Sequence, residues 1–147
     1  MPTTVGTEST VADLVKNLLT LEYDAIAAYD STIERLDNSE YRQQIENFRR
    51  DHESHIQELG RIADSLGIEK PVEGDMKQWL TTGKVALADL AGDDAILKAM
   101  KTNEDDTVAA YQQTLENDVT DAELRPVAEK GLADERRHRA WMETVQS

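Results

Sequence analysis

The chain has 147 residues, which is enough for one domain with a sizeable hydrophobic core. Its 30 acidic residues against 16 basic ones give a formal net charge of −14, which argues against nucleic acids and anionic membranes as partners. The chain contains no cysteine, which excludes disulfides, thiolate nucleophiles and metal sites with cysteine ligands.

Four segments place apolar residues every three or four positions, as the amphipathic helices of a bundle do. Few stretches are β-branched, and three prolines and seven glycines are few for this length, so we expect an all-α protein. We expect a single domain, residues 1–147, with helices at about 10–37, 39–66, 94–117 and 121–145. Pro126 leaves two starts open for the last helix, near residue 121 or, after a separate turn, nearer 125.

The first two predicted helices form a hairpin that carries a glutamate and two histidines in its apolar stripes. Glu22 and Tyr29 lie on one stripe of the first helix, and His52 and His55 lie within the stripe of the second. The connection between the helices is very short, so they run antiparallel. Glu22 and the histidines are at matching distances from the turn, so we expect their side chains to face one another.

Residues 67–93 are too long for a hairpin turn, and they contain Pro71, Gly74, Gly83 and Gly92. We expect a long crossover with one or two short helices there. The predicted architecture is therefore a four-helix bundle in which a long crossover joins two antiparallel helical hairpins.

The third predicted helix repeats the first. Residues 22–34 read EYDAIAAYDSTIE, and residues 104–116, which lie 82 positions further along, read EDDTVAAYQQTLE. Glu104 and Tyr111 therefore occupy the positions of Glu22 and Tyr29. The repeat indicates that the chain consists of two copies of one helical hairpin.

The fourth predicted helix repeats the second at an offset of 83 positions. Residues 51–55 read DHESH, and residues 134–138 read DERRH. The equivalent pairs are Asp51 and Asp134, His52 and Glu135, and His55 and His138. We expect the two aspartates to be exposed to solvent, with the orientation of an imidazole as the alternative.

Six polar side chains are thus predicted to meet at one level inside the bundle: Glu22, His52, His55, Glu104, Glu135 and His138. An unpaired ionised carboxylate in the interior costs several kcal/mol, and no lysine or arginine holds a matching position in the stripes. All three histidines of the chain fall at this level. Two divalent metal ions are the simplest source of positive charge, so we expect these residues to bind them. A polar network without metal is the alternative.

Tyr29 and Tyr111 each follow their glutamate by two helical turns on the same face. We expect core aromatic residues whose hydroxyl groups hydrogen-bond within the polar network. If the cluster binds metal, these hydroxyl groups would contact the carboxylates that hold it.

The lone glutamates of the first and third predicted helices and the E-x-x-H pair of the fourth resemble the ferritin-like superfamily, which includes rubrerythrin and bacterioferritin. The resemblance covers about residues 10–145 and is closest to small uncharacterised bacterial ferritin-like proteins filed as a domain of unknown function. It rests there on E-D-x-x-x-x-A-Y and on LAGDDAIL after a tryptophan-containing crossover. It implies a carboxylate-bridged di-iron or di-manganese centre that reacts with O2 or peroxide, with the ligands Glu22, His55, Glu104, Glu135 and His138.

His52 departs from the pattern, since the superfamily and this chain's own second half have glutamate there. Three carboxylates and three imidazoles carry a charge of −3, against +4 for two divalent ions. The additional nitrogen favours zinc or Fe(II) over manganese or ferric iron. Iron is the first choice and zinc or manganese the alternatives, and one metal ion or two remain open.

Two functions follow from these expectations, although the sequence names no catalytic residue. The first is a ferroxidase or peroxidase-like di-iron oxidoreductase, which requires a separate electron donor because the chain has no cysteine-rich electron-transfer module. The second is a non-catalytic structural or binding bundle with one zinc or a vestigial site, and a stress-related role is one option for it. We expect a homodimer and, because no signal peptide or membrane-spanning run is evident, a cytoplasmic location.

Overall fold

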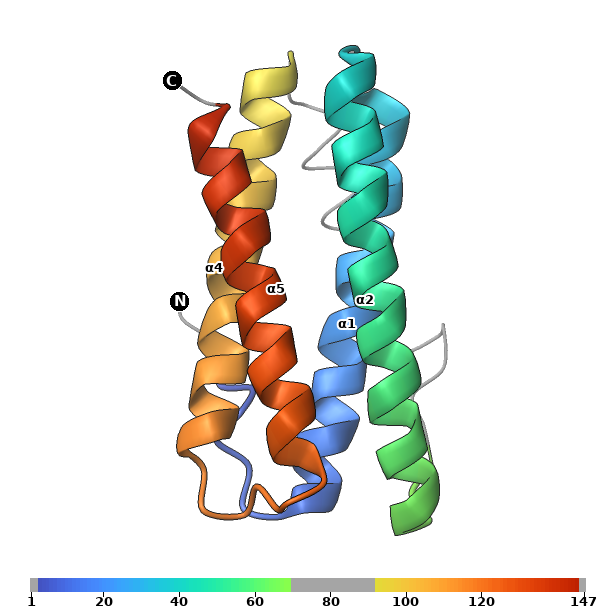
Figure 1. Ribbon diagram of the computed structural model, residues 1–147, viewed down its shortest axis with the longest axis vertical. Helices are drawn as coiled ribbons and strands as arrows, with labels where there is room; N and C mark the ends of the chain where they lie inside the picture. Colours follow the sequence, from blue (N-terminus) through green and yellow to red (C-terminus); the bar gives the residue numbers. More distant parts are fainter. Residues whose placement is uncertain (1–2, 70–91, 146–147) are drawn as a thin grey trace.

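The structure, a computed structural model, describes residues 3–69 and 92–145, and this part of the chain forms a bundle of four long helices (Figure 1). The helices are α1 (Val11–Arg35), α2 (Ser39–Leu66), α4 (Asp93–Glu116) and α5 (Leu124–Thr144). No strand occurs within the described ranges, and the predicted all-α fold is confirmed. The crossover predicted for residues 67–93 lies outside the described residues except at its two ends.

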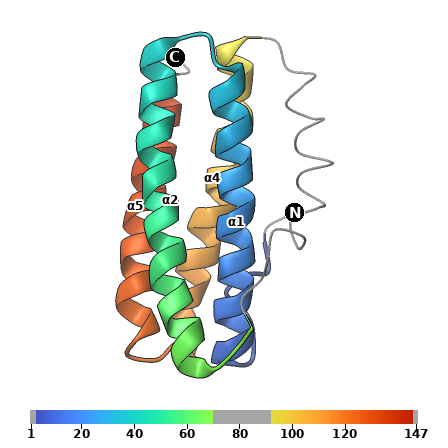
Figure 2. The ribbon, with the colours of Figure 1, turned by 90° about the vertical axis from the view of Figure 1, so that its right-hand side faces the viewer.

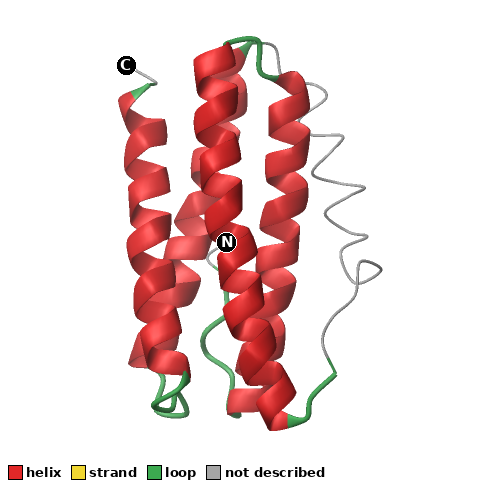
Figure 3. Cartoon of the chain, turned by 45° about the vertical axis from the view of Figure 1, so that its right-hand side comes forward, coloured by secondary structure: helices red, strands yellow, loops and turns green. Residues whose placement is uncertain are grey.

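Two antiparallel hairpins, α1 with α2 and α4 with α5, lie side by side as predicted (Figures 1 and 2). Packing is closest within each hairpin, and the hairpins meet through α1 against α4 and through α2 against α5. All four helices run along one axis (Figure 3). The arrangement makes neighbours of helices that are far apart in the sequence, and this positions the polar cluster described below.

Local sequence signals explain the helix ends. Asn38 Oδ1 accepts hydrogen bonds from two backbone N–H groups in the first turn of α2, at 2.9 and 3.2 Å. Gly67 ends that helix in the left-handed region, with φ 68°. The last helix begins at Leu124, whose backbone N–H donates to Asp121 Oδ1 at 2.9 Å. Pro126 then lies in the first turn, where its missing N–H leaves no hydrogen bond unmade.

The core consists of two apolar clusters with a polar layer between them. The cluster towards the start of α1 contains Leu14, Leu18, Leu59, Val108, Leu124 and Ala128, all at most 5 % exposed. The cluster towards the end of α1 contains Leu36, Ile45, Phe48, Leu97, Met100 and Met142, all at most 3 % exposed. The predicted polar residues lie between these clusters, so both ends of the bundle shield them from water.

Gly131 provides the space that one aromatic ring of the core needs. A Cβ atom at this position would lie 2.7 Å from Tyr111 Cε1, well inside van der Waals contact. The Tyr111 ring is fully buried, and its hydroxyl group donates to Glu22 Oε1 at 2.8 Å. The ring therefore cannot move aside without disturbing a residue of the polar layer.

We expect Gly131→Ala to destabilise the protein. Alanine favours a helix by about 1 kcal/mol over glycine, but overpacking a tight core costs roughly 1–3 kcal/mol. The melting temperature should fall by roughly 2–4 °C per kcal/mol of net loss. The control is the same substitution in a Tyr111→Leu background, where the smaller side chain removes the clash and alanine should be neutral or stabilising. A higher melting temperature for Gly131→Ala alone would contradict this explanation.

Candidate metal centre

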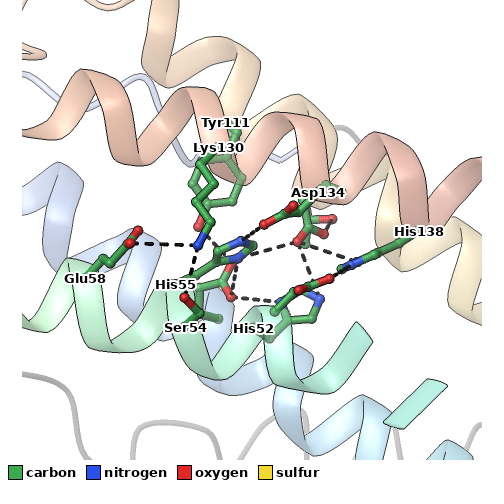
Figure 4. A network of polar contacts seen from close by, with 12 residues as sticks. His52, Ser54, His55, Glu58, Tyr111, Lys130, Asp134 and His138 are labelled. Carbon is green, nitrogen blue, oxygen red and sulfur yellow. Dashed lines mark hydrogen bonds and ion pairs between the residues drawn. The ribbon is translucent and has the colours of Figure 1, made fainter. Parts of the chain in front are cut away.

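The six residues that the sequence places at one level come together in the structure, and each is at most 1 % exposed. Each helix contributes at least one of them: Glu22 from α1, His52 and His55 from α2, Glu104 from α4, and Glu135 and His138 from α5. Figure 4 shows the three imidazoles converging between the helices. Within the described part of the chain, no lysine or arginine forms an ion pair with any of these three glutamates.

The donor atoms form two overlapping groups that could each hold a metal ion. The first group contains Glu22, His52, His55 and Glu135, and the second contains His52, Glu104, Glu135 and His138. In each group, one donor atom from every residue lies within 4.8 Å of the others. His52 and Glu135 belong to both groups, so they occupy the centre of the cluster.

The two tyrosines connect the hairpins through the repeated glutamates. Tyr111, in the second hairpin, donates to Glu22 Oε1 in the first at 2.8 Å. Tyr29, in the first hairpin, donates to Glu104 Oε1 in the second. Each hydroxyl group thus orients the carboxylate of the opposite hairpin, and burial together with these carboxylates raises both tyrosine pKa values, so the phenols stay protonated.

Each of the two repeated aspartates also contacts a residue of the other hairpin, in this case a histidine. The Nε2 atom of His138 lies 2.8 Å from Asp51 Oδ2, and the Nε2 atom of His55 lies 2.8 Å from Asp134 Oδ2. The expectation of solvent exposure is wrong, since the aspartate side chains are only 30 % and 15 % exposed. They are covered because α2 and α5 are neighbours in the bundle, which the sequence of one hairpin does not reveal.

These aspartates determine which imidazole nitrogen faces the cluster. When the Nε2–H of a neutral imidazole donates to a carboxylate, Nδ1 carries the free lone pair and is the nitrogen that can bind a metal ion. Nδ1 of His55 lies 3.3 Å from Glu22 Oε2, and Nδ1 of His138 lies 3.7 Å from Glu104 Oε1. Both histidines therefore present the same nitrogen to the interior.

At the centre of the cluster, the two hairpins differ at two repeat positions, 52/135 and 25/107, that contact each other in the second hairpin. Nε2 of His52 and Oε1 of Glu135 lie 3.4 Å apart, and both atoms are buried without a hydrogen-bond partner. The Thr107 hydroxyl lies 2.5 Å from Glu135 Oε2 and 3.1 Å from Glu104 Oε2 and can donate to either. The repeat position equivalent to Thr107 is Ala25, so the half with the additional carboxylate also has the additional donor.

Sequence reasoning missed the role of Thr107, although a signal was present. The two copies differ at the 25/107 and 52/135 positions, and at both the second hairpin has an oxygen-bearing side chain where the first has none. Thr107 and Glu135 lie on α4 and α5, the two helices of one hairpin, at similar distances from its turn, so the matching-distance rule could have indicated their contact.

The electrostatics of the cluster favour the binding of positive charge. Burial would raise the pKa of Glu22, but the adjacent His52 and His55 outweigh burial and lower this pKa to about 2. Burial would lower the pKa of His55, but Glu22 and Asp134 raise it to about 9. Burial and the charge of Glu104 raise the pKa of Glu135 above its usual value. Protons thus offset the clustered negative charge in the metal-free protein.

A family model matches residues 10–117 of the chain, and its description is a domain of unknown function, DUF2383. The chain belongs to the DUF2383 family. The part that matches the DUF2383 model contains α1, α2 and α4, with four of the six clustered residues, and α5 follows it. No curated protein and no solved structure matches the chain significantly. Among the described residues of this DUF2383 protein, no helix is long and apolar enough to cross a lipid bilayer.

Proposed function

We propose that this DUF2383 protein is a ferritin-like metalloprotein that binds two divalent metal ions, iron first, for redox chemistry with peroxide or O2. The observation that carries the proposal is the pair of four-residue groups that share His52 and Glu135. The facing atoms of these two shared residues have no other partner. Buried polar atoms are rarely left unpaired, so an ion between them would satisfy both.

The donor set fits divalent transition metals. Imidazole and carboxylate ligands suit iron, zinc and manganese. Di-metal carboxylate bundles use a glutamate from each of two helices and a Glu-x-x-His pair from each of the others, and this chain departs from that arrangement at His52. Glu22 and His55 would hold one ion, and Glu104 and His138 the other. Glu135 has two oxygen atoms and can bridge the two positions. A given nitrogen of His52 can serve only one of them.

The surrounding residues would fix this geometry before metal binds. Tyr29 and Tyr111 orient two carboxylates, and Asp51 and Asp134 orient two imidazoles. The apolar clusters on both sides exclude bulk water, which strengthens charge interactions in the cluster. Two Fe(II) ions would supply one electron each, so that one peroxide and two protons become two water molecules. The electrons come from iron as substrate or from a separate donor protein.

The first test is the metal content of protein purified without chelators, followed by anaerobic loading with Fe(II) and addition of peroxide. We expect about two ions per chain and peroxide consumption that matches the oxidation of iron. The matched pair is Glu22→Gln, which should lose metal, and Glu46→Gln on the exposed surface of α2, which should not. Wild-type protein that holds no metal, or iron-loaded protein that leaves peroxide unchanged, refutes the proposal.

A structural zinc site is the second candidate, and the three imidazoles in the cluster favour it. In that case the protein contains one zinc ion, loses stability when a chelator removes it, and consumes no peroxide after iron loading. Metal stoichiometry and peroxide consumption, measured on the same sample, distinguish the two candidates.

The aspartates that hold the histidines provide a further prediction. Asp51→Ala and Asp134→Ala should each weaken metal binding by roughly 10–100-fold, because each leaves one imidazole without its orienting partner. The control is Asp30→Ala, whose carboxylate pairs with Arg49 at the surface at 2.7 Å. Competition with a chromophoric chelator measures the affinities. Equal affinity in all three variants would show that the aspartates do not position the histidines.

A further inference from the structure

The polar cluster is closed on the α2/α5 side of the bundle. Arg137 Nη2 lies 2.9 Å from both Asp51 Oδ2 and Asp134 Oδ1, and these aspartates cover the outer nitrogens of His138 and His55. Figure 4 shows Asp134 beside His55. A metal cation that approaches from this side meets a guanidinium charge and two carboxylates that are already paired. This side is therefore a poor entrance for positive ions.

The α2/α5 side also has a cavity, towards the end of α2, but none of the six clustered residues lines it. A second cavity lies on the α1/α4 side. Its volume is about 190 Å³, and its lining residues are Leu21, Asp24, Ala25 and Ala28 of α1 with Asn103, Asp106 and Thr107 of α4. A divalent ion with six waters occupies roughly 180 Å³ at about 30 Å³ per water, so its volume is similar to that of the cavity.

Thr107 forms the link between this cavity and the cluster. Its side chain lines the cavity, yet the residue is only 4 % exposed, and its hydroxyl oxygen lies 2.5 Å from Glu135 Oε2. One threonine therefore separates the cavity from a carboxylate whose other oxygen has no partner. The opposite wall is open because α1 has Ala25 at the repeat position of Thr107 and Ala28 one turn later.

The outer part of the cavity carries two carboxylates. Asp24 and Asp106 are partly buried, and neither forms an ion pair with another residue of the described ranges. Asp24 Oδ1 is buried without a hydrogen-bond partner. Negative charge that has no paired cation among the described residues, at the mouth of a narrow opening, raises the local concentration of cations.

We propose that this cavity is the entrance through which hydrated divalent cations reach the buried cluster. Asp24 and Asp106 attract the ion, and Thr107 passes it to Glu104 and Glu135. The inference rests on the proposed metal binding, but it concerns the path of the ion and not the final site. The entrance carboxylates should therefore govern the rate of loading and leave the stoichiometry unchanged.

The test is the rate at which metal-free protein takes up Co²⁺, followed by stopped-flow absorbance of the bound ion. The double variant Asp24→Asn/Asp106→Asn should load about 10-fold more slowly than wild type at low salt. The difference should shrink as added salt screens the charges. Ala25→Leu should also slow loading, because it fills the cavity without changing charge. The charge-matched control is Glu40→Gln/Asp118→Asn, at exposed positions away from the cavity.

Each outcome decides one question. Slow loading in the asparagine variant, with an unchanged final spectrum and unchanged cobalt per chain, supports the entrance. Loading at the wild-type rate in that variant overturns the entrance and leaves the proposed function intact. The asparagine substitutions preserve side-chain shape, so they decide the question even if Ala25→Leu fails to fold. Wild-type protein that binds no cobalt at any concentration overturns the proposed function and the entrance with it.

Discussion

Glu135→Gln is expected to weaken metal binding strongly at both positions while leaving the metal-free protein at least as stable as the wild type. Glu135 belongs to both four-residue groups, so its charge serves each proposed ion. Glutamine keeps an oxygen that can accept the Thr107 hydrogen bond, but it removes the negative charge. Substitution of a residue that only orients a metal ligand typically lowers metal affinity by about 10–100-fold. Glu135 is proposed as a ligand itself, so we expect its loss to lower the affinity by at least about 100-fold.

The stability of the metal-free variant follows from the direction of one pKa shift. Burial and the nearby Glu104 raise the pKa of Glu135 above its usual value of 4.5. A carboxyl group with a raised pKa stabilises the folded state fully below its unfolded pKa, and this contribution is lost as the pH rises through its folded pKa. A neutral glutamine loses nothing over that range. At pH 8 the metal-free variant should therefore melt at the wild-type temperature or above it.

Two histidine variants test whether Glu135 is shared. His55 and His138 each belong to one group only, so His55→Ala and His138→Ala should each reduce the metal content from about two ions to about one. The surface control on α5 is Glu129→Gln, which should retain both ions. Glu135→Gln protein that keeps two ions, or His55→Ala protein that loses both, would contradict the shared role of Glu135.

The sequence was sufficient to identify the helices and the residues of the polar layer. Helical spacing places the glutamates and histidines in apolar stripes, and the short hairpin turns set their level along the bundle. The internal repeat then indicates that both hairpins contribute to the same layer. The structure brings all six residues together, as these local rules predict.

The contacts between hairpins could not be predicted in the same way. They depend on which helices of the two hairpins become neighbours, and a short turn determines only the packing within one hairpin. Asp51 consequently contacts His138 on α5, although its own helix contains a histidine one turn later. The contact of Thr107 with Glu135 is different, because it joins α4 to α5 within one hairpin, where the short turn determines which residues face each other.

The removal of metal should have the second large effect, on thermal stability. A ligand that binds only the folded state stabilises it by about 4.1 kcal/mol at a free concentration of 1,000 times its Kd. At roughly 2–4 °C per kcal/mol for a chain of about this size, the melting temperature should rise by roughly 8–16 °C on metal loading. Chelation should reverse the increase. Calorimetry of the same sample, before and after chelation, measures both changes.

The increase should depend on pH in a defined direction. The pKa of His55 is raised from 6.5 to about 9, so its protonated form stabilises the metal-free fold fully below pH 6.5, and this stabilisation is lost as the pH rises through about 9. Metal binds the neutral imidazole and must displace that proton. The metal-dependent rise in melting temperature should therefore be small at pH 6 and large at pH 8–9. In Glu135→Gln protein it should be much smaller at every pH. An increase that is equal at pH 6 and pH 9 would place the metal away from these histidines, for example among the exposed carboxylates of the surface.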